Sequence, residues 1–142
     1  MKLRIKYFNG AKRLQKIEKG NWIDVYSNKD LFIPENERAM IPLGFALELP
    51  KNWEGHLLPR SSTFKNYGII QTNSFAVIDN TYCGDEDMWR MPVYATRDTV
   101  INKNDRICQF RINKNQPCVK FETVEKLESI NRGGFGSTGK FD

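Results

Sequence analysis

Hydrophobic and polar residues alternate over short stretches along most of the chain. Leu3, Ile5 and Tyr7 alternate with polar neighbours at the start, a pattern typical of a strand with one buried face. Turn-forming residues such as Asn9-Gly10 separate the apolar stretches. Further strands are predicted at residues 22–26, 40–49, 56–58, 68–71, 75–78, 92–95, 106–112 and 119–124.

Helical patterning is almost absent. Residues 30–40 and 62–66 have room for a turn or two of helix at most. Many short strands in one chain favour an all-β domain, either a β-sandwich or a β-barrel. We therefore predict a β domain over residues 1–130, followed by a flexible, glycine-rich C-terminal arm over residues 131–142.

Length and composition exclude several classes of protein. At 142 residues, with 39% hydrophobic and 12% aromatic residues, the chain fits one folded domain and has no membrane span. Cys83, Cys108 and Cys118 show no C-x-x-C spacing, so neither a disulfide scaffold nor a zinc ribbon is expected. His56 is the single histidine, which argues against a histidine-rich metal site. We predict a cytoplasmic protein with reduced thiols.

The charge balance points to an anionic partner. There are 22 basic and 17 acidic residues, which give a formal charge of +5. The basic residues are dispersed and form no recognisable nucleic-acid motif, so nucleic acid is disfavoured as a partner. The charge alone does not say whether the anion is a polymer, a membrane surface or a small phosphate ester.

Arg60-Ser61-Ser62 is the first segment with candidate chemistry. An arginine offers a fork of donors to phosphate oxygens, and the hydroxyls add further hydrogen bonds. Taken alone, such a segment is more often a capped turn that begins a helix than a binding site.

Residues 71–84 are predicted to form two short strands around a turn. Asp79 is a candidate general base, because an aspartate is ionised at pH 7, although turns also favour aspartate.

Gln109 is expected on the same strand face as Ile107. A glutamine on an apolar face needs polar partners, so Gln109 is a candidate ligand contact, or else belongs to an edge strand.

The glycine-rich tail satisfies G-x-x-x-x-G-K from Gly134 to Lys140. A Walker P-loop is nevertheless rejected, because Phe141 replaces the required Ser or Thr and no helix follows. Glycines do expose backbone N–H groups that can wrap an anion, and Ser137 and Thr138 add hydroxyls. The alternative is a disordered tail.

Taken together and in order, five segments resemble the five motifs of the homotrimeric deoxyuridine triphosphatases (dUTPases). The resemblance runs from about Gly20 to Gly139, and its weakest part is the first segment, where Trp22 stands in place of the usual glycine. The five segments are residues 20–25, Arg60-Ser61-Ser62, residues 76–84, residues 105–109 and residues 134–139.

The resemblance implies a jelly-roll-like β-barrel that forms a homotrimer with active sites between subunits. It implies hydrolysis of dUTP to dUMP and pyrophosphate with Mg²⁺. Asp79 would activate the water that attacks the α-phosphorus, and Asp24 would steady the water shell of a Mg²⁺ held mainly by the triphosphate.

The same resemblance implies a set of substrate contacts. Phosphates would be held by Arg60, Ser61, Ser62 and Gln109. Uracil and the sugar would be read by a hairpin over residues 73–82 that includes Asn73, Val77, Ile78 and Tyr82. The arm would supply Arg132 to the γ-phosphate and Phe135 as the ring over uracil, with Gly136, Ser137 and Thr138 closing the site. Trp89, which ends an acidic stretch, is a second candidate for that ring.

Two other functions compete with this one. A dCTP deaminase of similar fold needs a catalytic glutamate on the following strand, and residues 91–95 contain none. A regulatory role, in which dUTP controls binding to a protein partner, is compatible with the sequence as an added function.

Overall fold

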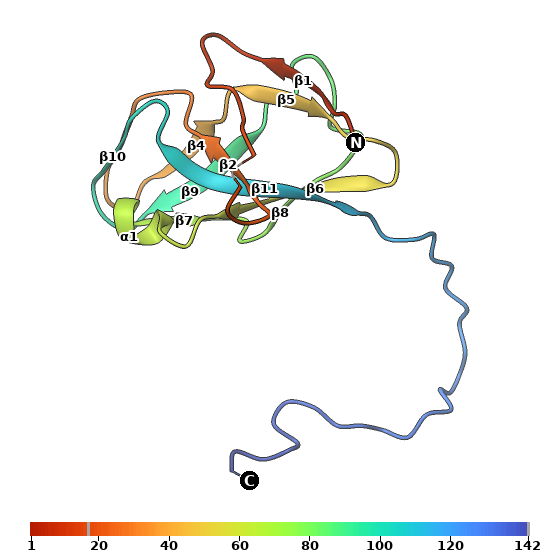
Figure 1. Cartoon of the computed structure of the whole chain (residues 1–142). Coiled ribbons are helices and arrows are strands. Elements are labelled where there is room, and N and C mark those ends of the chain that lie inside the picture. Colours follow the sequence, from red (N-terminus) through yellow and green to blue (C-terminus); the bar gives the residue numbers. More distant parts are fainter. Residues whose placement is uncertain (17, 142) are drawn as a thin grey trace.

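The computed structural model describes residues 1–16 and 18–141 (Figure 1). Its regular elements are short strands and one short helix, joined by loops. Alternating apolar residues form the strands, and turn residues end them after three to nine residues. In chain order the elements are β1 (Arg4–Tyr7), β2 (Ile23–Tyr26), β3 (Leu31–Ile33), β4 (Arg38–Pro42), β5 (Phe45–Glu48), β6 (Trp53–Pro59), α1 (Thr63–Tyr67), β7 (Ile69–Gln71), β8 (Ala76–Ile78), β9 (Arg90–Ala95), β10 (Thr99–Ile101) and β11 (Arg106–Lys114).

The strands pair antiparallel into four small sheets that enclose one core. The largest has the order β2-β11-β6-β8, and a second has the order β4-β9-β7. β1 pairs with β5, and β10 pairs with β3. This nearly all-β, jelly-roll-like architecture confirms the predicted fold class.

Three aromatic rings from different parts of the chain meet in the core. Trp89 lies 5.1 Å from Phe45 and 5.2 Å from Phe110, measured between ring centroids. The tryptophan side chain is only 1% exposed, and its ring packs over the backbone of Gly55. Trp89 is therefore a core residue, and the prediction that it covers a nucleotide base is wrong.

Residues 40–49, predicted as one strand, form two strands separated by a turn at Gly44. The φ angle of Gly44 is +77°, a conformation that favours glycine. An added Cβ would also lie 2.7 Å from the Cβ of Ala11. The turn lets β4 and β5 join different sheets, which helps to close the barrel.

Other sequence predictions also need correction. Residues 30–40 contain β3 and the first part of β4 and no helix, whereas α1 does form close to residues 62–66. The strand predicted at residues 119–124 is absent, because these residues are exposed and pair with none of the described strands. Regular structure ends at Lys114, and Figure 1 shows the chain running away from the barrel beyond β11. The extended segment thus begins well before residue 131.

The cysteines are all free thiols. Cys83 and Cys118 are exposed, whereas Cys108 is buried in β11. Burial, assisted by the negative charge of Asp24, raises the pKa of the Cys108 thiol, so this side chain behaves as a small apolar core residue. None of the helices in the described residues has the length and apolarity needed to cross a membrane.

Candidate active site

The sheet β2-β11-β6-β8 carries four of the five sequence segments singled out above. Asp24 in β2 pairs in register with Gln109 in β11, and Gln109 pairs with Leu58 in β6. Arg60 follows directly after β6, and Asp79 follows directly after β8. Segments that are far apart in the sequence are therefore neighbours in one sheet.

Asp24 and Arg60 form a largely buried ion pair. The Nε atom of Arg60 lies 3.0 Å from Oδ1 of Asp24, whose side chain is 7% exposed. The Nε atom of Arg106 lies 3.7 Å from the other carboxylate oxygen. A pair of this kind holds the guanidinium in a defined orientation, since the buried carboxylate needs its counter-charge. Arg60 is thus positioned as a rigid cationic fork.

The backbone around Arg60 is fixed by Thr63. The backbone N–H of Arg60 donates to Oγ1 of Thr63 at 2.9 Å, and that hydroxyl donates to the carbonyl of Ile107 at 3.0 Å. Ser62 occupies the N-cap position of α1, but its side chain makes no capping hydrogen bond. Ser61 is exposed and Ser62 is half-buried. The capped-turn explanation therefore does not account for the two serine hydroxyls.

Gln109 lies between these groups, but on a different face from the one predicted. A β-bulge between Arg106 and Cys108 breaks the alternation, so that Ile107 and Cys108 are both fully buried. Gln109 is half-buried, and its Nε2 donates to the carbonyl of Pro59 at 3.1 Å. The bulge thus turns Gln109 toward Asp24 and the end of β6 instead of the core.

Asp79 occupies an exposed turn at the end of β8. The backbone N–H of Thr81 donates to Oδ1 of Asp79 at 2.7 Å, and the N–H of Tyr82 donates to the Asp79 carbonyl at 3.0 Å. The hydrogen bond from Thr81 lowers the pKa of the Asp79 carboxyl below its ordinary value. Asp79 is therefore ionised at neutral pH and is held in a defined orientation, as a general base requires.

Residues 73–82, named here the base-reading segment, do not form a hairpin with two paired strands. β8 pairs with β6 instead, with Val77 opposite His56. The segment begins with a tight turn in which Ser74 has a φ of +55°. It ends at Tyr82, whose hydroxyl donates to the carbonyl of Met88 at 2.9 Å. Asn73 and Val77 are exposed, and Ile78 is half-buried.

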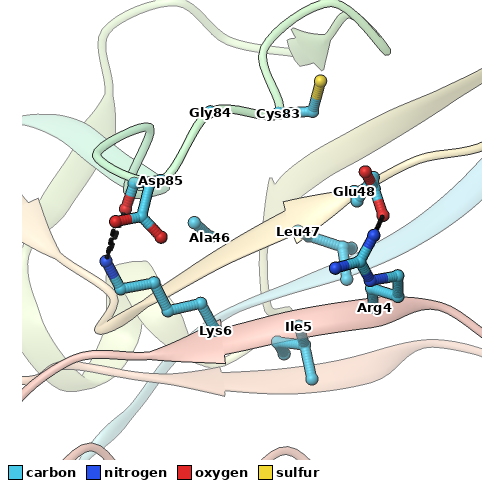
Figure 2. Close-up of a pocket in the computed structure, with 9 residues that line it drawn as sticks. All are labelled: Arg4, Ile5, Lys6, Ala46, Leu47, Glu48, Cys83, Gly84 and Asp85. Carbon is cyan, nitrogen blue, oxygen red and sulfur yellow. Dashed lines mark hydrogen bonds and ion pairs between the residues drawn. The ribbon is translucent and has the colours of Figure 1, made fainter.

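The loop after Tyr82 is attached to the first strand of the barrel. The Nζ atom of Lys6 lies 2.8 Å from Oδ2 of Asp85 and also donates to the Asp85 carbonyl at 2.9 Å. Figure 2 shows this contact beside a shallow pocket, in which the loop at Cys83 and Gly84 lies across from β1 and β5 and the Cys83 sulfur points away from them. The pocket lies beside the loop, and none of the predicted substrate-binding residues lines it.

The arm residues lie outside this cluster. Gly133, Phe135 and Gly136 all have positive φ angles, and Ser137 donates its N–H to the Gly134 carbonyl at 3.0 Å. Arg132 and Thr138 are exposed, as is the whole ring of Phe135. Within the described residues, the arm does not contact Asp24, Arg60 or Asp79.

Asp79 and Arg60 lie at opposite ends of β6. Ile78, just before Asp79, pairs with Gly55, whereas Pro59, just before Arg60, pairs with Cys108. At about 3.3 Å per residue, the two side chains are separated by roughly 20 Å along the sheet. One copy of the chain therefore does not bring both groups to a single phosphate.

Comparison with known proteins identifies the family. A sequence profile described as dUTPase matches residues 15–139. The chain belongs to the dUTPase family. It is 51% identical over 140 residues to the SPbeta prophage-derived deoxyuridine 5'-triphosphate nucleotidohydrolase YosS of Bacillus subtilis (strain 168), covering 98% of this chain and 99% of that protein. It is also 33% identical over 118 residues to the deoxyuridine 5'-triphosphate nucleotidohydrolase of Finegoldia magna, covering 80% of each.

Solved phage dUTPases share the fold. The dUTPase of Staphylococcus aureus phage phi11 matches with a TM-score of 0.78 at 16% identity, covering 91% of this chain and 100% of that one. The Staphylococcus bacteriophage 80alpha dUTPase with dUPNHPP matches with a TM-score of 0.79 at 19% identity, covering 97% of this chain and 98% of that one. The phi11 protein coordinates a structural Mg(II) ion.

Among the acidic residues that the structure describes, Asp24 has an oxygen suited to the water shell of a magnesium ion. No cluster of three or more histidine, cysteine, aspartate or glutamate side chains suited to a metal occurs in the described residues. Oδ2 of Asp24, however, is buried without a hydrogen-bond partner. Mg²⁺ prefers to keep several waters and to bind through one or two carboxylates together with substrate phosphates. The unpartnered oxygen of Asp24 is suited to accept a hydrogen bond from such a water.

Two residues of the candidate site were not predicted from the sequence. Arg106 contributes a second positive charge beside Asp24, and Thr63 fixes the backbone of Arg60. Arg106 lies inside the segment 105–109 and Thr63 directly follows Ser62, so their positions in or next to predicted segments were the available signal. Their roles depend on the pairing of β2 with β11 and on the contact of α1 with β11, which local sequence patterns do not reveal.

Proposed function

We propose that this chain hydrolyses dUTP to dUMP and pyrophosphate. The observation that best supports the proposal is the shared sheet, which presents an oriented arginine beside Asp24 and Gln109, and an ionised carboxylate at Asp79. Phosphoryl transfer relies mainly on positioning and on charge neutralisation, and these groups supply both.

Asp79 acts as the general base in this proposal. Its carboxylate accepts a proton from a water molecule while the water oxygen forms a bond to the α-phosphorus. The bond from the α-phosphorus to the bridging oxygen breaks at the same time, and its electron pair leaves with pyrophosphate. Because Thr81 donates to Oδ1 of Asp79, the carboxylate is oriented before the water binds.

The phosphate oxygens are bound by four residues, Arg60, Ser61, Ser62 and Gln109. The guanidinium gives charge-assisted hydrogen bonds, and its contact with Asp24 prevents it from rotating away. Mg²⁺, when bound, would supply positive charge to the triphosphate, and Asp24, whose Oδ2 lacks a hydrogen-bond partner, would steady the water shell of that ion. The base and the sugar are recognised by four residues of the base-reading segment, Asn73, Val77, Ile78 and Tyr82.

A homotrimer with active sites between subunits completes the site. Asp79 and Arg60 belong to opposite ends of β6 in one copy, so a second copy is needed to place both groups on one substrate. Regular structure ends at Lys114, and the residues that follow are irregular. The exposed arm is therefore long enough to leave its own barrel and reach another subunit. In this arrangement Arg132, Gly136, Ser137 and Thr138 close over the triphosphate.

The Phe135→Ala variant is expected to raise KM for dUTP by about fivefold to 150-fold, because a ring stacked on a base contributes roughly 1–3 kcal/mol. Its melting temperature is expected to be unchanged, since the ring is fully exposed. Steady-state kinetics and thermal unfolding measure the two effects. Phe141→Ala, another exposed ring in the arm, is the matched control. Equal KM values for Phe135→Ala and Phe141→Ala would contradict the role of Phe135 as the ring over uracil.

An assay of both nucleotides tests the proposed reaction directly. Incubation with dUTP and Mg²⁺ should yield dUMP and pyrophosphate, whereas dCTP should yield neither product nor ammonia. The dCTP deaminase alternative predicts released ammonia. Residues 91–95, now seen as part of β9, contain no glutamate, which argues against that alternative. Ammonia from dCTP together with intact dUTP would overturn the proposal.

The regulatory role and the location in the cell remain predictions. The 80alpha protein is one of the phage dUTPases that control transfer of virulence genes, but at 19% identity the likeness extends to the fold alone. A dUTP-controlled protein partner of this chain is therefore a secondary hypothesis. Three free thiols support a cytoplasmic location.

A further inference from the structure

His56 lies in β6, on the face that points away from the core, and pairs in register with Val77 of the base-reading segment. Its neighbours in the strand, Gly55 and Leu57, are buried, so the His56 side chain points to the opposite face. In register it stands between Val77 of β8 and Arg111 of β11. The chain's single histidine is thus next to the strand that leads to Asp79.

The imidazole of His56 is held by Glu54. Nε2 of His56 lies 2.8 Å from Oε2 of Glu54, and the two side chains are only 15% and 22% exposed. They are two residues apart on one strand and therefore share a face. Arg111, the other charged residue beside His56, stacks on Trp22 at 4.7 Å instead. Glu54 is consequently the group that sets the orientation of the imidazole ring.

The His56 ring also supports Phe75. The two ring centroids are 4.8 Å apart at an angle of 64°, an edge-to-face arrangement favourable for aromatic rings. Phe75 closes the tight turn at Asn73, because its backbone N–H donates to the Asn73 carbonyl at 2.5 Å, and the N–H of Ser74 donates to the Gln71 carbonyl at 3.1 Å. A contact on Phe75 therefore fixes the turn that carries Asn73.

We propose that His56, held by Glu54, is a positioning residue for base recognition. Its ring supports Phe75 and so keeps the polar groups of the base-reading segment in the geometry that matches uracil. The inference rests on the proposed function and adds a residue that contacts no substrate. Discrimination between bases depends on polar groups that cannot shift to pair with the wrong base. Removal of the support therefore weakens both binding and discrimination.

Kinetics of the His56→Leu variant test the inference. We expect KM for dUTP to rise by about twofold to tenfold, which corresponds to the strength of one aromatic pair. We expect kcat to stay within about twofold, because Asp79 is oriented separately by Thr81. The preference for dUTP over dCTP and dTTP should fall. Glu54→Gln keeps an oxygen acceptor for the imidazole and should remain close to the wild type.

A matched control separates positioning from lost stability. Ile112→Val removes one methyl group from β11, in the same sheet, and lowers stability without touching Phe75. KM and base preference should not change in this variant. If Ile112→Val and His56→Leu change KM equally, or if His56→Leu changes only the melting temperature, the inference is overturned.

The imidazole signals give a readout independent of catalysis. Because the chain has one histidine, its proton NMR spectrum contains a single set of imidazole signals. These signals should shift in Phe75→Leu, which removes the neighbouring ring, and on saturation with dUMP. Unchanged signals in both experiments would overturn the inference. If the wild type fails to hydrolyse dUTP, the proposed function fails instead, and the response to Phe75→Leu still decides whether His56 supports the turn.

Discussion

The Asp79→Asn variant is expected to bind dUTP with nearly unchanged affinity and to hydrolyse it about 10²- to 10⁴-fold more slowly. The amide has the same size as the carboxylate and still accepts the hydrogen bond that Thr81 donates to Oδ1. It cannot accept the proton of the attacking water, so only the chemical step is lost. Single-turnover kinetics and calorimetry with a non-hydrolysable analogue measure the two quantities separately.

Glu86→Gln is the matched control for this variant. Glu86 lies in the loop that follows Asp79, and its side chain is exposed, with one long contact of 3.9 Å to Lys6. The substitution removes the same charge from the same region without removing a base. A comparable loss of turnover in Glu86→Gln, or near-native turnover in Asp79→Asn, would contradict the role assigned to Asp79.

Mixed trimers extend the same prediction to the quaternary structure. Arg60→Ala should also be inactive, because it removes the phosphate-binding fork. If each site takes Asp79 from one subunit and Arg60 from another, then unfolding and refolding the two variants together should restore part of the activity. Recovery is impossible if both groups act within one chain. The recovered activity of the mixture, compared with each variant alone, therefore measures whether sites are shared.

The Trp89→Ala variant is expected to lose about 3–5 kcal/mol of the free energy of unfolding. The ring is 1% exposed and contacts Phe45, Phe110 and the backbone of Gly55, so its removal leaves a large cavity between sheets. Denaturant unfolding at fixed protein concentration measures the loss. Base recognition should survive in the fraction that folds, since the ring does not reach the surface.

Two further substitutions sharpen this prediction. Trp89→Phe should lose much less stability, because it keeps an aromatic ring and removes an indole N–H that is buried without a partner. Phe32→Ala removes an aromatic ring that is 62% exposed and should change stability little. A Trp89→Ala protein of normal stability with a raised KM for dUTP would restore tryptophan as the base-covering ring.

The corrected predictions share a physical cause. Trp89 and Phe135 are both aromatic residues near candidate segments, and nothing local distinguishes a core ring from an exposed one. Three-residue strands such as β3 and β10 are too short to show a periodic pattern, and they form because they pair with each other. Residues 119–124 alternate like a strand but have no strand to pair with in the described residues.

The sequence by itself determined the all-β class, the chemistry of the candidate residues and the order of five segments that places the chain among the dUTPases. These properties depend on residue type and on spacing over a few positions. Only the tertiary structure decided that Asp24 holds Arg60, that a bulge turns Gln109 out of the core, and that Asp79 and Arg60 lie at opposite ends of β6. These relations depend on strand register between distant segments, which the packing of the whole core selects.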